Sequence, residues 1–382
     1  MSDTKDPVLI VAGEASGDLH AAKLVTELTA MGDFAFFGSA GERMRSAGVE
    51  ATVRADGLSI VGLLEIGQAL PMFWKVYQKL IAEAESRNAK LAILVDFPDF
   101  NLKLAKALKK RGITVVYFIS PQLWAWRKYR IKTIRDHVDL VISILPFEKD
   151  WYAKNGVDHV EYVGNPLAME VHADSSKEEF CERHDIDPSQ PIVSLLPGSR
   201  GAEITRILPM LIETSRYMLA KQPDLQFIVA LPKDRLSHKI DSPDTVRWVE
   251  GETFDALNAS NAAAITSGTA TLEAGIIGTP MAIVYKTSSL NYKLLRPLID
   301  VEHFGLINLI AGKRVAAELI QDDFTPATLA AELFRLLDPA VNSSVRAELS
   351  AAVDKLGHGG ASKRAAEAVV QLISEQRETA AW

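Results

Sequence analysis

Short apolar runs alternate with helical patterns along most of the chain. Runs rich in Val, Ile and Leu that end in Gly, Pro, Ser or Asp are typical of parallel strands buried on both faces. In the first half they lie at 8–11, 34–38, 91–95, 114–119, 138–144 and 160–163. The segments between them repeat apolar residues every three or four positions, as an amphipathic helix does. The pattern predicts a parallel sheet of six or seven strands that is covered by helices.

The alternation stops at a polar, irregular segment and then restarts. The second series of apolar runs lies at 192–196, 226–231, 246–249, 263–266 and 281–285. We therefore predict an α/β fold of two Rossmann-like, doubly wound domains, 1–166 and 191–355, joined by a linker at 167–190. An Ala-rich helical pattern at 362–374 follows several glycines. We expect residues 356–382 to form a C-terminal helix that packs back on the first domain.

Amino-acid composition limits the cellular compartment and the binding partners that we expect for the chain. A net charge of -7 over 382 residues disfavours a general nucleic-acid binder, because phosphate contacts need a basic surface. The one cysteine, Cys181, leaves no internal disulfide and no paired-cysteine metal site, which fits a reducing compartment. No apolar run reaches the roughly 18–20 residues of a spanning helix, and the first residues lack a signal-peptide core. These features predict a cytoplasmic protein, with contact to a membrane surface left open.

Two strand-to-helix turns of the second domain have the residues of an anion site. In the first, Pro197, Gly198 and Ser199 follow an apolar run, and a helical pattern starts at Glu203. Free backbone N–H groups at a helix start bind phosphate, and the guanidinium of Arg200 would pair with it bidentately. An ordinary turn with a surface arginine would have the same sequence.

The second turn favours the nucleotide interpretation. Ser267, Gly268 and Thr269 open a helix after the run 263–266, and Glu273 follows about one turn later. The backbone donors and hydroxyls suit a phosphate, and Glu273 suits the hydroxyls of a ribose. The alternative is a capped helix with Glu in its first turns. We call these two strand-to-helix turns, 197–199 and 267–269, the anion-ready turns. Their presence in one domain favours a nucleotide site.

Polar residues also follow the first strand of the first domain. The turn and helix start after 8–11 contain Glu14, Ser16, Asp18 and His20. The glycines at 13 and 17 do not fit a dinucleotide fingerprint. Helix capping by Ser16 and Asp18 explains only part of the set, so we predict a functional loop.

A pair of acids follows the run 91–95. Asp96, Asp99 and Asn101 lie where α/β enzymes place chemistry, at the carboxyl end of a parallel strand. One of the two Asp residues could cap the next helix. Two acids this close favour a catalytic base or an acceptor for a substrate hydroxyl.

Aromatic residues gather in two further segments. In 120–130, Trp124, Trp126 and Tyr129 accompany three cations, which suits a sugar face and a phosphate, or an anionic membrane. The segment 58–77 is apolar but interrupted by glycines and Pro71. Buried packing is its default explanation, yet the interruptions make it a poor core helix or strand. An exposed apolar surface there would suit an acyl chain or a membrane interface.

Six motifs in order give the chain a resemblance to a known family. They are Gly13-Glu14-Ala15-Ser16-Gly17-Asp18, Pro98-Asp99-Phe100-Asn101, Ser120-Pro121-Gln122-Leu123-Trp124-Ala125-Trp126, Leu145-Pro146-Phe147-Glu148, Leu196-Pro197-Gly198-Ser199-Arg200 with Glu203, and Ser267-Gly268-Thr269-Ala270-Thr271-Leu272-Glu273. From about residue 8 to residue 335 the chain resembles the lipid-A-disaccharide synthases. It departs from the family's pattern at Ile307, where Pro is common, and at Ala316-Ala317, which precede Glu318. The resemblance implies a GT-B fold, in which the two domains face each other across a cleft.

The resemblance also implies an activity. The chain would be an inverting hexosyltransferase that needs no metal and no other cofactor. It would join UDP-2,3-diacylglucosamine to 2,3-diacylglucosamine 1-phosphate, releasing UDP and forming the β-1,6-linked lipid A disaccharide 1-phosphate. Because both lipids belong to the inner membrane of a Gram-negative bacterium, the protein would be cytoplasmic and peripherally associated with that membrane. No nucleic acid is implied, and a homodimer is left open.

The implied roles sort the candidate residues into four sets. The catalytic set is Asp99, the first candidate for the base, with Asp96 as its alternative, and Glu14. The UDP-binding set is Gly198, Ser199, Arg200, Glu203, Ser267, Gly268, Thr269, Glu273, Asn308 and Gln321. The acceptor-binding set is Ser16, Asp18, His20, Asn101, Gln122, Trp124 and Trp126. The set for acyl or membrane contact is Val61, Leu63, Leu64, Met72, Phe73 and Trp74.

Two other functions fit parts of the sequence. Another GT-B enzyme that acts on a soluble UDP-sugar, such as a UDP-N-acetylglucosamine 2-epimerase, would need no exposed apolar segment. A membrane-peripheral module that binds a nucleotide sugar without turnover would need no base. The presence of Asp99 with Asn101 beside a full phosphate set argues against the second of these.

Overall fold

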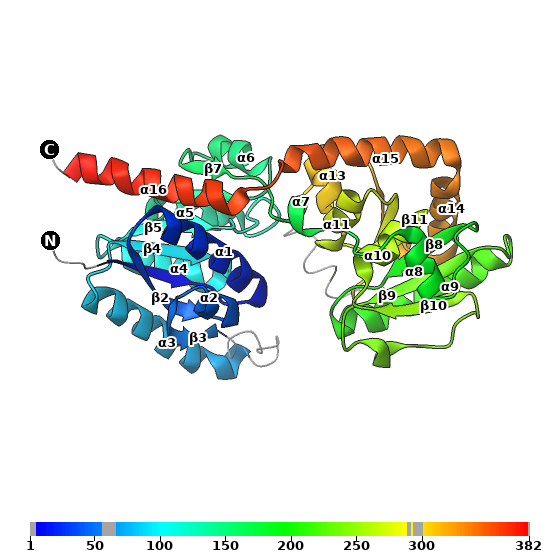
Figure 1. The fold of residues 1–382 in the computed structure, drawn as a ribbon, viewed down its shortest axis with the longest axis horizontal. Helices are drawn as coiled ribbons and strands as arrows, with labels where there is room; N and C mark the ends of the chain where they lie inside the picture. The colour runs from blue at the N-terminus through cyan, green and yellow to red at the C-terminus, as the bar shows by residue number, and fades with distance from the viewer. Residues whose placement is uncertain (1–4, 56–65, 289–291, 293–300, 381–382) are drawn as a thin grey trace. The chain divides into compact units, whose positions relative to one another are not determined.

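Two compact units make up the chain in this computed structural model, which describes residues 5–55, 66–288, 292 and 301–380. One unit contains residues 1–166 and 359–382, and the other contains residues 167–358 (Figure 1). Three residues that we assigned to acyl contact, Val61, Leu63 and Leu64, lie outside the described residues.

The first unit is built on a parallel sheet with the strand order β3-β2-β1-β4-β5-β6-β7. Its strands are β1 Asp6–Val11, β2 Phe34–Ala40, β3 Glu50–Arg54, β4 Leu91–Val95, β5 Thr114–Phe118, β6 Leu140–Ser143 and β7 Val160–Tyr162. β1 pairs in parallel with β2 on one side and with β4 on the other. The predicted parallel sheet is confirmed. In this unit the apolar runs missed β3, an edge strand that is half-exposed along its length.

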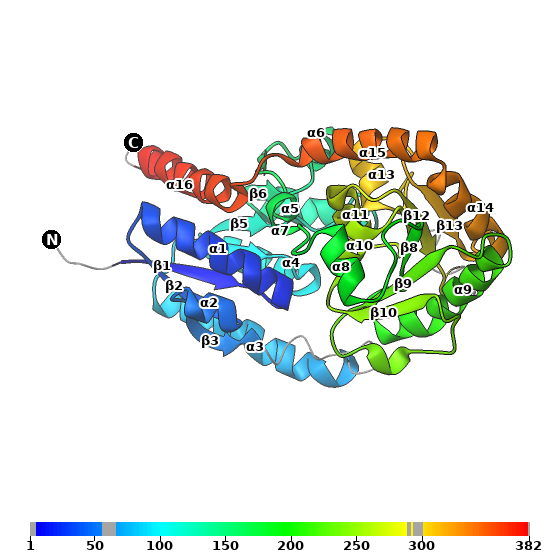
Figure 2. The ribbon, with the colours of Figure 1, turned by 45° about the vertical axis from the view of Figure 1, so that its right-hand side comes forward.

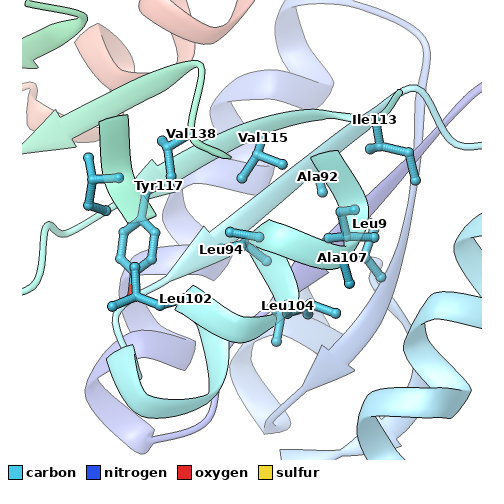
Figure 3. Close-up of a cluster of buried hydrophobic side chains, with 14 of the residues drawn as sticks. Leu9, Ala92, Leu94, Leu102, Leu104, Ala107, Ile113, Val115, Tyr117 and Val138 are labelled. Atoms are coloured by element: carbon cyan, nitrogen blue, oxygen red, sulfur yellow. The ribbon is translucent and has the colours of Figure 1, made fainter. Parts of the chain in front are cut away.

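Helices cover both faces of this sheet, and β1 sends alternate side chains to the two faces. On one face α1 (Ala15–Met31) and α16 (Ala361–Ala380) lie side by side (Figures 1 and 2). On the other face lie α3 (Ile66–Ser86), α4 (Pro98–Lys109) and α5 (Ile131–His137). Figure 3 shows Leu94 of β4 beside Leu102 and Leu104 of α4 in this second core. The remaining helices of the unit are α2 Glu42–Ser46 and α6 Glu148–Lys154.

The second unit is built on a parallel sheet with the strand order β10-β9-β8-β11-β12-β13. Its strands are β8 Ile192–Leu196, β9 Gln226–Leu231, β10 Val246–Glu250, β11 Ala262–Thr266, β12 Met281–Tyr285 and β13 Ala317–Ile320. Its helices are α7 Leu167–Glu170, α8 Lys177–Arg183, α9 Gly201–Leu219, α10 Thr253–Ala259, α11 Ala270–Ile277, α13 Leu306–Ala311, α14 Pro326–Leu337 and α15 Pro339–Val353. This order is that of a Rossmann sheet, so the second predicted α/β domain is confirmed as well.

The segment 167–190 differs from the linker that we expected, because it is part of the second unit. It forms α7 and α8, and α8 packs against α10 with Phe180 and Cys181 fully buried. Ser176 and Glu179 form a capping box at the start of α8. The polar residues that suggested a linker therefore surround a short helix that buries two apolar side chains.

A helix also replaces part of the interrupted apolar segment. α3 contains Pro71 near its N-terminal end, where the ring removes a backbone hydrogen bond. Val76, Leu80, Ile81 and Ala84 recur at helical spacing and are buried in the core. Packing of this apolar stripe stabilises the helix despite the proline.

Each sheet has a point at which the strand order reverses. These switch points lie between β1 and β4 in the first unit and between β8 and β11 in the second. In open α/β sheets, ligands bind outside the carboxyl ends of the strands at such a point. Within the described ranges, no helix is long and apolar enough to cross a membrane.

Candidate active site

A pocket of about 240 Å³ lies at the carboxyl ends of β8, β9 and β11 in the second unit. Predicted UDP-binding residues from both turns line it, namely Gly198, Ser199, Glu203, Ser267, Gly268, Thr269 and Glu273. Residues from the first turns of α9, α10 and α11 also line it. The structure thus brings the two anion-ready turns together at one pocket, on the switch point of the sheet.

Two glycines shape the backbone of this pocket. Gly198 has a φ of +107°, and a Cβ at this position would lie 2.8 Å from Oε2 of Glu203. Gly268 has a φ of +155° and faces open space, since an added Cβ would meet nothing within 4 Å. The first N–H groups of a helix have no partner within the helix. The pocket therefore presents backbone donors to an anion.

Glu273 supplies a half-buried carboxyl to the same pocket. Burial raises the pKa of Glu273, because the pocket removes its charged form from water. Hydroxyl groups of a ribose would donate hydrogen bonds to this carboxylate and replace the lost water.

Arg200, the predicted phosphate ligand, extends into solvent with 84% of its side chain exposed. Its guanidinium lies 3.5 Å from Oε1 of Glu203, and its backbone N–H donates to Oε2 of the same residue at 3.3 Å. An exposed ion pair of this kind contributes little free energy. Exchange of Glu203 for a phosphate would therefore cost Arg200 little.

Asn308 and Gln321, for which UDP binding stays a prediction, stabilise loops in the second unit. Oδ1 of the fully buried Asn308 accepts from the N–H groups of Val315 and Ala316, both at 2.9 Å. Oε1 of Gln321 accepts from the N–H of Thr287 at 2.6 Å, and its Nε2 donates to the carbonyl of the same residue at 3.2 Å. Neither side chain lines the pocket. A polar residue within an apolar stretch has the same sequence pattern whether it anchors a loop or binds a ligand.

In the first unit, the backbone makes a strained turn where β4 ends. Asp96 and Phe97 have φ values of +49° and +50°, which are unfavourable for residues other than glycine. The carbonyl of Asp96 accepts from the hydroxyl of Tyr117 at 2.7 Å and from Nδ2 of Asn101 at 2.8 Å. Both donors are buried, so they hold the turn in place. Asn101 therefore positions Asp96, and acceptor binding stays a prediction for it.

The Asp96 carboxyl is half-buried at this turn. Burial raises the pKa of Asp96, the negative charge of Glu14 raises it further, and the N–H of Phe97 acts in the opposite direction. Glu14 is exposed and belongs to the loop that follows β1. The switch point of the first sheet thus brings together two of the three predicted catalytic carboxylates.

Asp99 has different partners. It lies in the first turn of α4, and its side chain is 67% exposed. Its Oδ1 accepts from Nη1 of Arg127 at 2.8 Å and also from Nη2 of Arg130. The predicted first candidate for the base is therefore ion-paired with two arginines.

Asp18, predicted to bind the acceptor, caps a helix. Its buried carboxylate accepts from the N–H groups of Gly41 at 2.7 Å and Arg43 at 2.9 Å, at the start of α2. Asp18 belongs to α1 but caps α2. Capping of its own helix therefore could not account for this residue. Ser16 is exposed in the first turn of α1, and His20 is half-buried one turn later. For these two residues acceptor binding stays a prediction.

Trp124 is a core residue rather than an exposed sugar platform. It is 8% exposed, and its Nε1–H donates to Oε1 of the buried Glu148 at 3.0 Å. Gln122 and Trp126 are exposed, and the guanidinium of Arg127 lies 4.2 Å from the centroid of the Trp126 ring. Of the three predicted side chains in this loop, Gln122 and Trp126 are accessible to an acceptor.

An aromatic row connects α3 to the Asp96 turn. Met72 and Trp74 are 37% and 61% exposed. The ring of Phe73 packs against Phe97 and Phe100, with centroids 6.1 and 6.2 Å away. The apolar surface of α3 is therefore continuous with the turn that carries Asp96.

Several site residues gave no signal in the sequence. Pro232 lines the pocket from the loop after β9, and Thr253 lines it from the first turn of α10, which follows β10. The strand order, once known, points to them because β9 lies next to β8 and β10 lies next to β9. Tyr117 supports Asp96 from within an apolar strand, where its hydroxyl does not disturb the pattern.

Comparison with known proteins identifies the family to which the chain belongs. The family model described as lipid-A-disaccharide synthetase matches residues 8–372. The chain belongs to the lipid-A-disaccharide synthase family. It is a glycosyltransferase of lipid A biosynthesis, as the sequence motifs implied.

Members of the family are similar to this chain over nearly their whole length. The lipid-A-disaccharide synthase of Syntrophus aciditrophicus (strain SB) is 43% identical over 378 residues, which are 96% of this chain and 98% of that protein. The lipid-A-disaccharide synthase of Myxococcus xanthus (strain DK1622) is 40% identical over 377 residues, which are 97% of this chain and 98% of that protein.

Solved structures place the fold among GT-B enzymes. The glycotransferase of kitacinnamycin has a TM-score of 0.66 at 15% identity, covering 96% of this chain and 99% of that chain. The UDP-GlcNAc 2-epimerase from Neisseria meningitidis bound to UDP-GlcNAc has a TM-score of 0.61 at 14% identity, covering 96% of this chain and 100% of that chain. At these identities the likeness concerns the fold alone.

Proposed function

We propose that the chain transfers a 2,3-diacylglucosaminyl group from UDP to the C6 hydroxyl of 2,3-diacylglucosamine 1-phosphate, with inversion and without a metal. The products are UDP and the β-1,6-linked disaccharide 1-phosphate. The observation that carries the proposal is the pair of strand-end sites, one with backbone donors and Glu273 and one with Asp96 beside Glu14. Membership of the family supplies lipid A precursors as the substrate class.

The pocket of the second unit is the donor site in this proposal. The diphosphate of the UDP-sugar accepts hydrogen bonds from backbone N–H groups at the starts of α9 and α11. Glu273 accepts from the ribose hydroxyls. Arg200 exchanges Glu203 for the diphosphate and offsets the charge that develops as UDP leaves.

Asp96, rather than Asp99, is the base. A carboxylate with a raised pKa takes up a proton more readily, and the pKa of Asp96 is raised by its burial and by Glu14. Asp96 accepts the proton of the C6 hydroxyl while O6 forms a bond to the anomeric carbon. The bond from that carbon to the UDP oxygen breaks on the opposite face, and its electron pair leaves with UDP.

The test is an assay with both lipid substrates in detergent, in which UDP and the disaccharide are measured together. We expect the two products in equal amounts, a β linkage, and the same rate after addition of a chelator. Conversion of UDP-N-acetylglucosamine alone would replace the proposal with a soluble UDP-sugar enzyme. Binding of the UDP-lipid without either product would replace it with a binding module.

We also propose that α3 attaches the protein to the cytoplasmic surface of the inner membrane. The exposed Met72 and Trp74 and the aromatic row to Phe97 support this assignment. An exposed apolar surface that leads to the acceptor site would let acyl chains stay in contact with lipid while the sugar reacts.

Liposome pelleting tests the membrane assignment. The double variant Met72→Gln and Trp74→Gln should leave more protein in the supernatant than the wild type. Tyr217→Gln is the matched control, because Tyr217 is 39% exposed and lies in α9 of the second unit. Equal pelleting of all three proteins would contradict the assignment.

A further inference from the structure

Two arginines converge on one exposed carboxylate oxygen in the first unit. Arg127 and Arg130 both donate to Oδ1 of Asp99. The side chain of Asp99 is 67% exposed, whereas that of Arg130 is only 13% exposed. The side chain of Arg127 is 36% exposed. Both arginines are thus less exposed than the carboxylate that they bind.

Local structure fixes the positions of the two arginines. Arg127 has a φ of +54°, and its guanidinium lies 4.2 Å from the centroid of the Trp126 ring. Arg130 ends the 3-10 turn Lys128–Arg130 that leads into α5. Upstream, the same loop is tied to the core by the hydrogen bond from Trp124 to Glu148. Both guanidiniums are therefore held where α4 begins.

The charge of the cluster is not balanced. Two guanidiniums carry two positive charges and ten N–H donors, while Asp99 supplies one negative charge and one bonded oxygen. A phosphate monoester carries about 1.5 to 2 negative charges and three strong acceptor oxygens. Planar guanidiniums bind such oxygens bidentately. A phosphate monoester would satisfy these arginines better than Asp99 does.

We propose that Arg127 and Arg130 bind the phosphate group of the acceptor, and that Asp99 occupies this subsite until the acceptor displaces it. This inference rests on the proposed function, which supplies an acceptor with a 1-phosphate. Asp99 lies in the first turn of α4, three residues after Asp96. One glucosamine ring can therefore direct its C6 hydroxyl to Asp96 and its C1 phosphate to the arginines.

Under this assignment the acceptor phosphate and the donor diphosphate bind at different sites. The acceptor phosphate replaces a carboxylate at the start of α4, where a helix also favours negative charge. The diphosphate of the donor is bound in the second unit. An acceptor without its phosphate should bind weakly for lack of these contacts, and should also leave Asp99 in the subsite.

The experiment compares two acceptors, 2,3-diacylglucosamine 1-phosphate and the same lipid without its phosphate, in detergent free of phospholipid. The quantity measured is the ratio of their kcat/KM values. In Arg130→Gln we expect this ratio to fall by about 10- to 100-fold, the effect of a lost hydrogen bond to a charged group. Arg127→Gln should act in the same direction. Lys132→Gln, the same change at an exposed position of α5, is the matched control.

The outcomes distinguish the subsite from the function. A ratio in Arg130→Gln and Arg127→Gln equal to that of the wild type and Lys132→Gln would overturn the subsite, with the glycosyl transfer still standing. Absence of disaccharide from both acceptors in the wild type would instead remove the proposed function. A second arm measures pelleting with vesicles of phosphatidylglycerol. If Arg130→Gln reduces pelleting and leaves the acceptor ratio unchanged, the arginines bind membrane headgroups and the proposal is wrong.

Discussion

Asp96 and Asp99 lie three residues apart in the chain, yet their surroundings differ. Asp96 is half-buried near another carboxylate, and its backbone is held in the left-handed region by Tyr117 and Asn101. Asp99 is exposed and bound by two cations. The sequence placed both acids at the strand end but could not rank them, because the ranking depends on partners that come from other strands and loops.

Asp96→Asn should lower kcat by at least about 100-fold, the usual contribution of a general base, because an amide cannot accept the proton. Asp99→Asn should lower kcat by less, since Asp99 faces arginines rather than the reacting hydroxyl in this proposal. Turnover is measured from UDP release, and circular dichroism verifies that both variants fold. A larger loss in Asp99→Asn than in Asp96→Asn would return the role of base to Asp99.

Glu14→Gln should shift the acid limb of the pH profile of kcat/KM to lower pH. The negative charge of Glu14 raises the pKa of Asp96, so its removal lowers that pKa. Asp96 then loses its proton, and becomes active as a base, at a lower pH. Glu42→Gln, an exposed acid in the first turn of α2, serves as the control. An acid limb that stays in place in Glu14→Gln would show that Glu14 does not act on the base.

At the scale of elements, the sheet and most strands followed from the apolar runs, because burial on both faces produces continuous apolar sequence. β3 and β13 were missed, since half-exposed edge strands lack that pattern. α3 was mistaken for an interrupted segment, because the packing of its buried stripe outweighs Pro71. The structure brings the two anion-ready turns together at one pocket. Asn308 and Gln321 anchor loops, and the sequence alone does not distinguish a loop anchor from a ligand contact. UDP binding stays a prediction for both groups.

Glu148 links two elements of the first unit, and its titration should be visible in stability. It lies at the start of α6 and accepts a hydrogen bond from Trp124 in the loop after β5. Burial raises the pKa of Glu148 from 4.5 to about 7, although the bond from Trp124 acts in the opposite direction. The unfolded chain therefore gives up this proton at a lower pH than the folded protein does.

The free energy of unfolding should accordingly fall as the pH rises from 4.5 to about 7 and level off above that range. Glu148→Gln should remove this part of the pH dependence and keep the acceptor for Trp124. Urea unfolding at several pH values measures the free energy of unfolding of each protein. Glu161→Gln, at an exposed position, is the control. The same slope in wild type and Glu148→Gln would contradict a folded pKa that is raised.

At the scale of the whole molecule, the chain passes twice between its two units, after residue 166 and after residue 358. Ala361, Ala365, Ala366 and Val369 of α16 are buried in the core that contains α1. The first unit is thus assembled from the two ends of the described chain, with the whole second unit inserted between them. From the sequence we expected a C-terminal helix on the first domain, and α16 packs there. Apolar periodicity alone marks a helix but not its partner.

Ala366→Glu should destabilise the first unit alone. A carboxylate in place of a fully buried alanine would have no compensating partner, which typically costs several kcal/mol. Calorimetry should show one unfolding transition at lower temperature and a second, raised by UDP, at its wild-type temperature. Gln371→Glu, at an exposed position of the same helix, is the control. A shift of the UDP-dependent transition would contradict the division into units.

The insertion has a consequence for biosynthesis on the ribosome. Domains usually fold in the order in which they are translated, but α16 is translated after the whole second unit. Until α16 is translated, the apolar face of α1 that packs against it stays uncovered. At that stage residues 167–358, which form the second unit, have already been translated. We expect the nascent chain to complete its second unit first, and to depend on chaperones until α16 emerges.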